Sequence, residues 1–246
     1  MKLNNKIFIV TGGEGLIGKS IIKNIKKNEG IAISLDIRID KSNMDPDKYY
    51  LDTNNDNSIK DVLDKVINRF GKIDGLVNNA YPRTSDWGQA FEDTSNESFS
   101  LNLDMQLGRI FAITKPVLKT MKLNQSGSIV NIASIYGMVG NDFKIYENTN
   151  INPPVAYSAI KGGLINFNRY IASCYGKYNI RANCISPGGI FDNQDPIFVK
   201  NYEEKVPMKR MGKPDDIAPL VSFLLSDESE YITGQNIAID GGWTCI

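Results

Sequence analysis

The sequence predicts an α/β protein with one doubly wound parallel sheet of about seven strands, flanked by helices. Two observations predict it. Short, continuous apolar runs alternate with segments of helical periodicity along the whole chain, as in βαβ units that bury a parallel sheet. The first run, Ile7 to Val10, leads into a glycine cluster and then a helix, the arrangement of a nucleotide-binding turn. At 246 residues with 41% hydrophobic content, residues 1–246 fit a single domain.

The composition narrows the classes of function. Lys and Arg together number 28, as do Asp and Glu, so we expect neither a nucleic acid nor a membrane as partner. The chain contains no histidine, which excludes Ser-His-Asp and Cys-His sites and the usual His-rich metal sites, and we predict no metal. The three cysteines show no CxxC spacing, and no apolar run forms a signal peptide or reaches the ~20 residues of a membrane span. A cytoplasmic protein is expected.

The glycine cluster after the first strand is the first candidate binding site. It includes Gly12, Gly15 and Gly18, and residues 20–27 after it have the apolar spacing of an amphipathic helix. Glycines let the backbone approach a pyrophosphate, and a helix N-terminus offers free N–H groups and partial positive charge. A tight turn without a ligand is the alternative interpretation.

Asp36 is the second candidate. It follows the predicted strand Ile31 to Leu35, eighteen residues beyond Gly18, about where a dinucleotide-binding fold places the acid that binds the adenosine ribose. A carboxylate there repels a 2′-phosphate, so we predict NAD(H) in preference to NADP(H). Arg38 weakens this preference, and a plain loop carboxylate is the alternative.

The rest of the chain continues the alternation of strands and helices. Two polar stretches interrupt it, at about residues 138–154 and 191–211, and are predicted as excursions near the substrate. Because parallel strands end at one edge of their sheet, residues that follow the strands are expected to gather there. The further predicted strands cover residues 49–53, 73–80, 128–134, 180–186 and 235–242, and the further helices cover 59–70, 97–121, 155–175 and 215–225.

Tyr157 and Lys161 form a candidate acid/base pair. They are four residues apart in the predicted helix 155–175, so they lie one turn apart on the same face. A free tyrosine has a pKa near ~10, and a neighbouring ammonium lowers the pKa by favouring the phenolate. Such a pair can exchange a proton with a substrate. An outward-facing Tyr and Lys on an ordinary helix is the alternative.

Several short motifs follow one another in a fixed order along the chain. They are Thr11-Gly12-x-x-Gly15-x-x-Gly18, Asn78-Asn79-Ala80, Asn102, Ser134, Tyr157-x-x-x-Lys161, Pro187-Gly188 and Asp240-Gly241-Gly242. This ordered set resembles that of the short-chain dehydrogenase/reductase family. The resemblance covers essentially the whole chain and implies a Rossmann-type fold and oxidoreductase activity.

The resemblance also implies a role for each matched residue. Tyr157 would give or take the proton at the substrate oxygen. Lys161 would lower the pKa of Tyr157 and hold the nicotinamide ribose. Ser134 would hydrogen-bond the substrate oxygen. Asn102 would hold a water that links Lys161 to solvent. The implied cofactor contacts are Gly12, Gly15 and Gly18 at the pyrophosphate, Asp36 at the adenosine ribose, Asp52 at the adenine, Asn79 and Ala80 on the adenosine side, Ile190 at the carboxamide, and Leu16, Ile17, Tyr157, Lys161, Pro187 and Gly188 as further contacts.

Three departures from the family pattern affect these expectations. The run Gly15-Leu16 stands where most members of this length have another residue and then Gly, so the turn is expected to differ in shape. Asp192 occupies a position that is often Thr, which leaves one cofactor contact in doubt. An unusually long segment precedes Tyr157, and its extra residues fall in 138–154, where they are expected to shape the substrate mouth.

The predicted substrate rim is polar. Tyr81 and Arg83 follow the Asn-Asn-Ala sequence in place of a glycine, and Tyr136, Tyr146 and Asn193 belong to the same rim. This lining suits a hydroxyl-rich molecule, including a phosphorylated or carboxylated one, better than a steroid or a fatty chain. The alternative is that these loops are polar only because loops usually are.

Residues 78–83 and 187–193 also resemble oxidoreductases of bacterial surface-sugar pathways, those of flagellin modification and sialic-acid-like sugars. The main hypothesis is therefore an NAD-dependent enzyme that interconverts a secondary alcohol and a ketone on a sugar or amino-sugar derivative. The alternatives are an NADPH-dependent reductase of 3-oxoacyl or small carbonyl substrates, and a cofactor-binding sensor or scaffold without turnover. The family resemblance further implies a homodimer or homotetramer, paired through the helices around 102–121 and 157–175.

Overall fold

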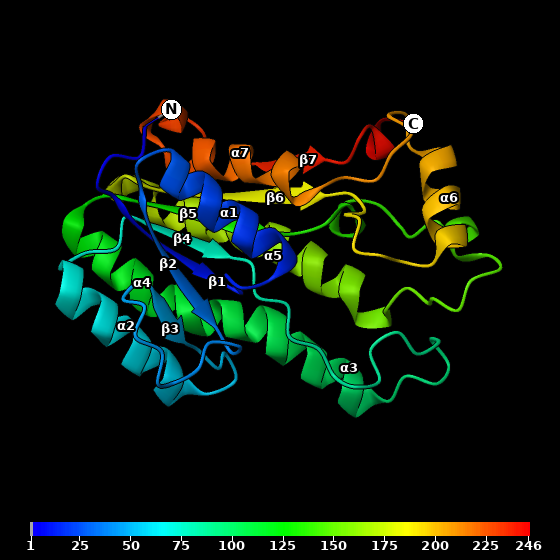
Figure 1. The fold of residues 1–246 in the computed structure, drawn as a ribbon, viewed down its shortest axis with the longest axis horizontal. Coiled ribbons are helices and arrows are strands. Elements are labelled where there is room, and N and C mark those ends of the chain that lie inside the picture. The colour runs from blue at the N-terminus through cyan, green and yellow to red at the C-terminus, as the bar shows by residue number, and fades with distance from the viewer. Residues whose placement is uncertain (1) are drawn as a thin grey trace.

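The computed structural model describes residues 2–246 and contains a seven-stranded sheet between two layers of helices (Figure 1). The described strands all run parallel, in the order β3-β2-β1-β4-β5-β6-β7. This confirms the predicted doubly wound sheet. The strands are β1 (Ile7–Thr11), β2 (Ile31–Asp36), β3 (Lys48–Tyr50), β4 (Gly75–Asn78), β5 (Gly127–Ile132), β6 (Ile180–Pro187) and β7 (Asn236–Ile239).

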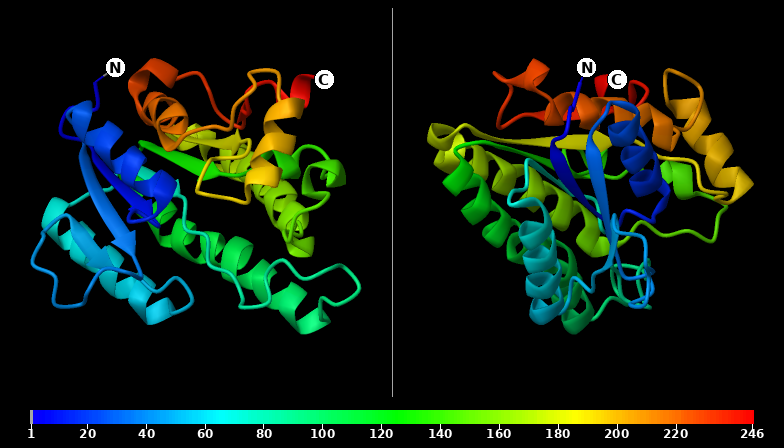
Figure 2. Two further views of the ribbon diagram at one scale, coloured as in Figure 1. Left: turned by 45° about the vertical axis from the view of Figure 1, so that its right-hand side comes forward. Right: turned by 60° about the vertical axis from the view of Figure 1, so that its left-hand side comes forward.

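The two layers of helices bury both faces of the sheet. Figures 1 and 2 show α1 and α7 on one face and α2, α4 and α5 on the other. In β1, Phe8 and Val10 face the first layer while Ile7 and Ile9 face the second, which explains why the whole strand reads as apolar. The helices are α1 (Leu16–Lys27), α2 (Asp56–Phe70), α3 (Asn96–Leu103), α4 (Arg109–Asn124), α5 (Val155–Tyr175), α6 (Pro196–Lys205) and α7 (Pro214–Leu225).

Local residue types set the ends of several helices. The side chain of Asn55 accepts hydrogen bonds from Asn57 N and Ser58 N at the start of α2, and Gly71 ends it with a φ of 73°. Pro154, in an extended conformation, immediately precedes α5. These signals lie in the sequence, and the predicted boundaries of both helices are accordingly close to the observed ones.

One long predicted helix is interrupted. Residues 97–121 were expected to be uniformly α-helical, but a π-helical turn, η1 (Asp104–Gly108), separates α3 from α4. A π-helical turn adds a residue to the helical repeat and is frequent at functional sites. The turn re-aims the side chains on either side of it, and Asn102 and Gln106 lie on opposite sides of its start.

The two polar excursions contain structure that the sequence did not reveal. Residues 138–154, called the extra segment below, include a short 3₁₀-helix, η3 (Phe143–Tyr146). Residues 191–211 include α6, which lies apart from the two helical layers, near the C-terminus (Figure 2). Across residues 2–246, no helix combines the length and the apolar character needed to cross a membrane.

Candidate active site

A cavity of about 550 Å³ opens at the carboxyl ends of β1, β4, β5 and β6. It brings together the predicted acid/base residues, most of the glycine turn and part of the predicted substrate rim. The predicted residues that line it are Gly12, Gly15, Leu16, Ile17, Asn79, Tyr81, Ser134, Tyr136, Tyr146, Tyr157, Lys161, Pro187, Gly188 and Ile190. The predicted residues outside its lining are Gly18, Asp36, Asp52, Ala80, Arg83, Asn102 and Asn193.

The glycine turn forms one wall of this cavity. Gly12 and Gly15 line it, and α1 begins directly after Gly15 with no acidic residue in its first turn. Gly18 has a packing role, since a Cβ on it would lie 2.1 Å from Gly12 O. The wall therefore offers backbone N–H groups and the positive end of a helix, which suits a pyrophosphate.

Asn79 fixes the glycine turn to the end of β4. Its Nδ2 donates to the backbone oxygens of Thr11 (3.1 Å) and Gly12 (3.0 Å). The Thr11 hydroxyl accepts from the N–H of Asn79 (3.0 Å) and of Ala80 (3.1 Å). The Asn-Asn-Ala sequence thus holds the binding turn in shape.

Asp36 lies at the end of β2 and is engaged by Arg38. Its carboxylate accepts from Arg38 Nε and Nη2, both at 3.2 Å, and from Glu14 N at 3.0 Å. Burial opposes ionisation, but these hydrogen bonds and the guanidinium charge outweigh it and lower the pKa of Asp36. Arg38 itself lines the cavity, so the anion and its cation lie together at the expected adenosine end.

Asp52 lies elsewhere. Its Oδ1 accepts from Asn54 N at 2.9 Å, and the residue lines a separate hollow beside α2 and β3. Asp52 is not among the residues that line the main cavity. Its predicted contact with an adenine stays a prediction.

Ser134, Tyr157 and Lys161 meet where β5 and α5 adjoin the cavity. Lys161 Nζ donates to Ile132 O at 2.8 Å and lies 5.5 Å from the centre of the Tyr157 ring. Burial lowers the pKa of Lys161 to about 8. Burial also raises the pKa of Tyr157, against a hydrogen bond with Ser134 that lowers it. The net shift of the Tyr157 pKa is therefore opposite to the lowering expected from Lys161, because desolvation of the phenolate dominates.

Two further aromatic rings pack edge-on against Tyr157. The Tyr81 ring centre lies 5.7 Å from that of Tyr157, and the Trp87 ring centre lies 6.2 Å from it. Tyr81 and Trp87 also contact each other at 5.8 Å. Such edge-to-face contacts restrict ring orientation. Trp87 is not predicted as a site residue from the sequence, although its place in the loop after the Asn-Asn-Ala sequence is a usable signal.

Asn102 anchors the same loop. Its Nδ2 donates to Thr84 Oγ1 at 2.8 Å and to Ser98 O at 2.9 Å, and its Oδ1 accepts from Thr84 N at 3.2 Å. Gln106, in the π-helical turn, is 3% exposed, and neither of its amide atoms has a hydrogen-bond partner among the described residues. The predicted water-holding role of Asn102 stays a prediction, and Gln106 is a buried amide that the sequence analysis missed.

A ladder of buried amides crosses the sheet beneath the site. Asn78 Nδ2 donates to Asn131 Oδ1 (2.8 Å), Asn131 Nδ2 to Asn168 Oδ1 (3.0 Å), and Asn168 Nδ2 to Ala182 O (3.1 Å). The ladder links β4, β5, α5 and β6. Asn131 and Asn168 were not singled out from the sequence, because a single polar residue inside an apolar run carries no signal of its partner.

The far side of the cavity is aromatic. Tyr136 and Tyr146 line it, and Tyr146 OH donates to Tyr136 OH at 3.3 Å. Phe198 and Tyr202, both from α6, also line it. The stretch 191–211 is predicted from the sequence as an excursion near the substrate, but Phe198 and Tyr202 are not predicted as site residues, because the polar pattern does not reveal the helix α6 within it.

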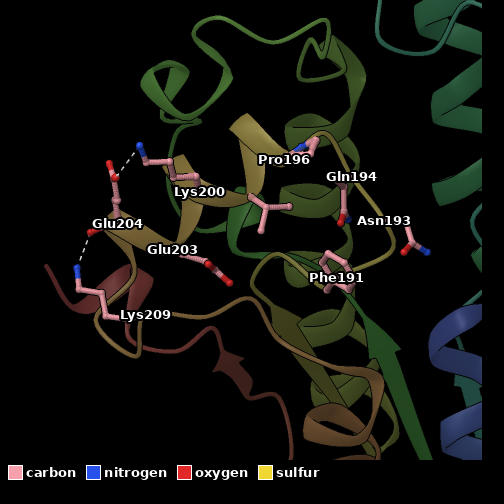
Figure 3. Close-up of a pocket in the computed structure, with 9 residues that line it drawn as sticks. Phe191, Asn193, Gln194, Pro196, Lys200, Glu203, Glu204 and Lys209 are labelled. Carbon is pink, nitrogen blue, oxygen red and sulfur yellow. Dashed lines mark hydrogen bonds and ion pairs between the residues drawn. The ribbon is translucent and has the colours of Figure 1, made fainter.

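A second, wider cavity of about 810 Å³ lies on the outer side of α6 (Figure 3). Asn193 lines this second cavity, and Gln194 lines both cavities. In Figure 3 Lys200 reaches Glu204, at a distance of 3.8 Å. The predicted rim is therefore divided, with Tyr81 and Tyr136 at the inner cavity and Asn193 at the outer one.

Comparisons with known proteins agree with this geometry. Residues 34–244 match the model of a protein family described as enoyl-(acyl carrier protein) reductase. A solved structure of a short chain dehydrogenase from Leptospira borgpetersenii with bound NAD+ superposes with a TM-score of 0.87 at 35% identity, covering 99% of this chain and 94% of that one.

Characterised relatives span several activities. The chain is 36% identical to post-translational flagellin modification protein A of Campylobacter coli, over 98% of this chain and 99% of that protein. It is 33% identical to a 3-oxoacyl-(acyl-carrier-protein) reductase of Thermotoga maritima, over 98% and 99%. It is 32% identical to a 7alpha-hydroxysteroid dehydrogenase of Bacteroides fragilis, over 99% and 96%.

Proposed function

Because the chain belongs to the short-chain dehydrogenase/reductase family, oxidoreductases that act on CH–OH groups with NAD or NADP, we propose that it interconverts a secondary alcohol and a ketone on a polar sugar or amino-sugar derivative. We assign NAD(H) as its cofactor, the cytoplasm as its location and bacterial surface-glycan biosynthesis as its setting. The similarity to flagellin modification protein A supports the setting.

The observation that carries this proposal is the meeting of Ser134, Tyr157 and Lys161 in one cavity with the glycine turn. A nicotinamide cofactor, when bound, would supply or accept the hydride. Tyr157 gives or takes the proton at the substrate oxygen, and Ser134 hydrogen-bonds that oxygen as charge develops on it. Lys161, a buried cation held by Ile132 O, would stabilise the phenolate form of Tyr157 as the proton leaves and would contact the nicotinamide ribose.

The residues present fit a nicotinamide dinucleotide. Gly12 presses so closely on Ala80 that a Cβ would lie 2.9 Å from its Cα, while Gly15, Leu16 and Ile17 border the cavity. This glycine wall would hold the pyrophosphate. Asp36 would accept from the ribose hydroxyls at the adenosine end, and Gly188 and Ile190 would border the nicotinamide.

Replacing the acid/base group tests the proposal. Tyr157→Phe keeps the ring and its contacts with Tyr81 and Trp87 but removes the hydroxyl. We expect loss of turnover by at least ~100-fold with unchanged NADH binding, as measured by nicotinamide fluorescence. Tyr231→Phe is the matched control, since Tyr231 is fully exposed. Equal turnover in the two variants would refute the proposed mechanism.

A second candidate is an NADPH-dependent 3-oxoacyl or small-carbonyl reductase. This candidate is favoured by the 33% sequence identity to the Thermotoga maritima reductase. It is also favoured by Arg38, which lies in the cavity lining. Parallel titration with NADH and NADPH separates the two, because preference for NADPH would favour the reductase. A sensor or scaffold without turnover is the third possibility, and detectable turnover that depends on Tyr157 excludes it.

A further inference from the structure

The extra segment and α6 are fastened to each other. Asn201 Nδ2 donates to the carbonyl oxygens of Ile145 and Glu147, each at 3.3 Å. Lys205 forms an ion pair with Asp142, at the start of η3. Because these contacts join the backbone of the extra segment to α6, the two elements form one wall of the cavity.

This wall places Tyr146 among the other phenols of the site. Its ring centre lies 5.3 Å from that of Phe198, and its hydroxyl donates to Tyr136 OH. Tyr146 also lines the same cavity as Tyr81 and Tyr157. A residue from the extra segment is thus close to the acid/base tyrosine.

The phenols around this point are neutral. Burial raises the pKa of Tyr136 and of Tyr146, so each keeps its proton at physiological pH. Each hydroxyl can therefore donate one hydrogen bond and accept another, while the rings present apolar faces. Hydroxyls beside aromatic faces match a ring that carries hydroxyl groups on an apolar frame.

The charged side chains in the cavity lining are Arg38, Lys161 and Asp192. Lys161 lies beside Tyr157, with its Nζ 5.5 Å from the ring centre, and the contacts of both cations are with residues other than Tyr136 and Tyr146. Arg38 pairs with Asp36 at the end of β2, and Lys161 donates to Ile132 O. Asp192 follows β6 and is negative, so it gives no site for an anion. A phosphate or carboxylate placed between Tyr136 and Tyr146 would lose its hydration without meeting either cation, which is costly.

We propose that Tyr146, together with Tyr136, is a specificity-determining residue that binds the hydroxylated, uncharged part of a substrate ring and rejects phosphate or carboxylate groups in the part of the cavity that these two phenols face. This narrows the substrate class expected from the sequence, which included phosphorylated and carboxylated molecules. The inference rests on the proposed function, since the ring it describes is the substrate of the Tyr157 site.

Both tryptophans of the chain pack against residues that line the cavity, so their fluorescence is expected to change when a ligand binds there. Trp87 packs on Tyr157, and Trp243 stacks on Tyr202 with ring centres 4.6 Å apart; the chain contains no others. Tryptophan fluorescence of the NAD+-loaded protein can thus be followed during titration with three probes, methyl glucoside, methyl glucuronide and a phosphorylated methyl glucoside. The three probes share the same sugar ring. The first is uncharged, the second carries a carboxylate and the third carries a phosphate.

We expect methyl glucoside to bind at least ~10-fold more tightly than either charged probe. Tyr146→Phe should weaken its binding by about 5- to 10-fold, the effect of one lost hydrogen bond, and leave NAD+ binding unchanged. Tyr231→Phe should match the wild type, since that side chain is fully exposed.

Three results would overturn the inference: equal or tighter binding of a charged probe, no binding of methyl glucoside, or equal affinities in Tyr146→Phe and Tyr231→Phe. Failure of the proposed function looks different. It would appear as absent NAD+ binding, or as turnover that survives Tyr157→Phe, and neither depends on Tyr146.

Discussion

The side-chain amide of Asn102 binds Thr84 through both of its polar atoms. Asn102 Nδ2 donates to the Thr84 hydroxyl at 2.8 Å, and Asn102 Oδ1 accepts from the backbone N–H of Thr84 at 3.2 Å. Thr84 lies between Tyr81 and Trp87, whose rings pack on Tyr157. Asn102 therefore acts on the acid/base residue through a loop, as a positioning residue.

Asn102→Ala should loosen this loop. We expect a loss of about 1–2 kcal/mol in the free energy of unfolding, because buried donors and acceptors lose their partners, and a rise in KM as the rings around Tyr157 become mobile. Thermal unfolding and steady-state kinetics measure both. Asn124→Ala, at an exposed position, is the control. A shifted pH profile with unchanged stability would instead favour the water-holding role.

Lys161→Met should stabilise the protein while abolishing turnover. The folded-state pKa of Lys161 is lowered to about 8 from 10.5, so the unfolded chain binds this proton more tightly and burial of the cation costs stability below about pH 8. The cost is about 3 kcal/mol, offset by ~1 kcal/mol for the lost hydrogen bond to Ile132 O.

The sign of this effect is checked by thermal unfolding across a pH series. As pH rises from about 8 towards 10.5, wild-type Lys161 is increasingly neutral in the folded state, so the advantage of the Met variant should shrink. An advantage that grows with pH over this range would contradict the assignment of desolvation as the cause.

Asp36→Asn should reduce discrimination between NADH and NADPH. The carboxylate repels a 2′-phosphate and also holds Arg38 by two contacts of 3.2 Å. Its neutralisation removes the repulsion and releases the guanidinium, so we expect the preference for NADH to fall by at least ~10-fold. The double variant Asp36→Asn with Arg38→Ala should recover only part of the preference for NADH, because it lacks both the repelling carboxylate and the guanidinium. An unaltered ratio of dissociation constants in Asp36→Asn would exclude Asp36 as the selector.

The outer face of α4 and α5 should mediate assembly. Phe111 and Tyr170 are 52% and 66% exposed, and Phe111 packs edge-on against Phe167 of α5 at 6.3 Å. Exposed aromatic side chains on adjacent helices favour an interface. We expect a dimer or tetramer by light scattering, and a smaller species for Phe111→Lys. Phe91→Lys, at a 75% exposed position, is the control, and a monomeric wild type would contradict the prediction.

The sheet and the glycine wall could be predicted because their signals are local. Continuous apolar runs specify buried parallel strands, and Gly12 and Gly18 sit where a Cβ would collide with Ala80 or Gly12. Residues that directly follow strands, such as Asn79 and Ser134, were placed correctly at the cavity, because the topology alone brings them to one edge.

The rest depends on contacts between distant parts of the chain. α6 lies in a polar stretch, and its buried residues Phe198 and Tyr202 pack on groups more than fifty residues away, such as Tyr146. The π-helical turn decides which way Asn102 and Gln106 point, and no residue type announces such a turn. The pKa of Tyr157 follows from its burial, which spacing to Lys161 does not reveal.

The amide ladder of Asn78, Asn131 and Asn168 makes substitutions at these three positions depend on one another. Each amide donates to the next in a single direction, so replacing any one leaves its neighbours buried with unsatisfied groups. Single substitutions at these positions should be selected against, whereas joint replacement by apolar residues should be tolerated. Among descendants of a common ancestor, the three positions are therefore expected to change together or not at all.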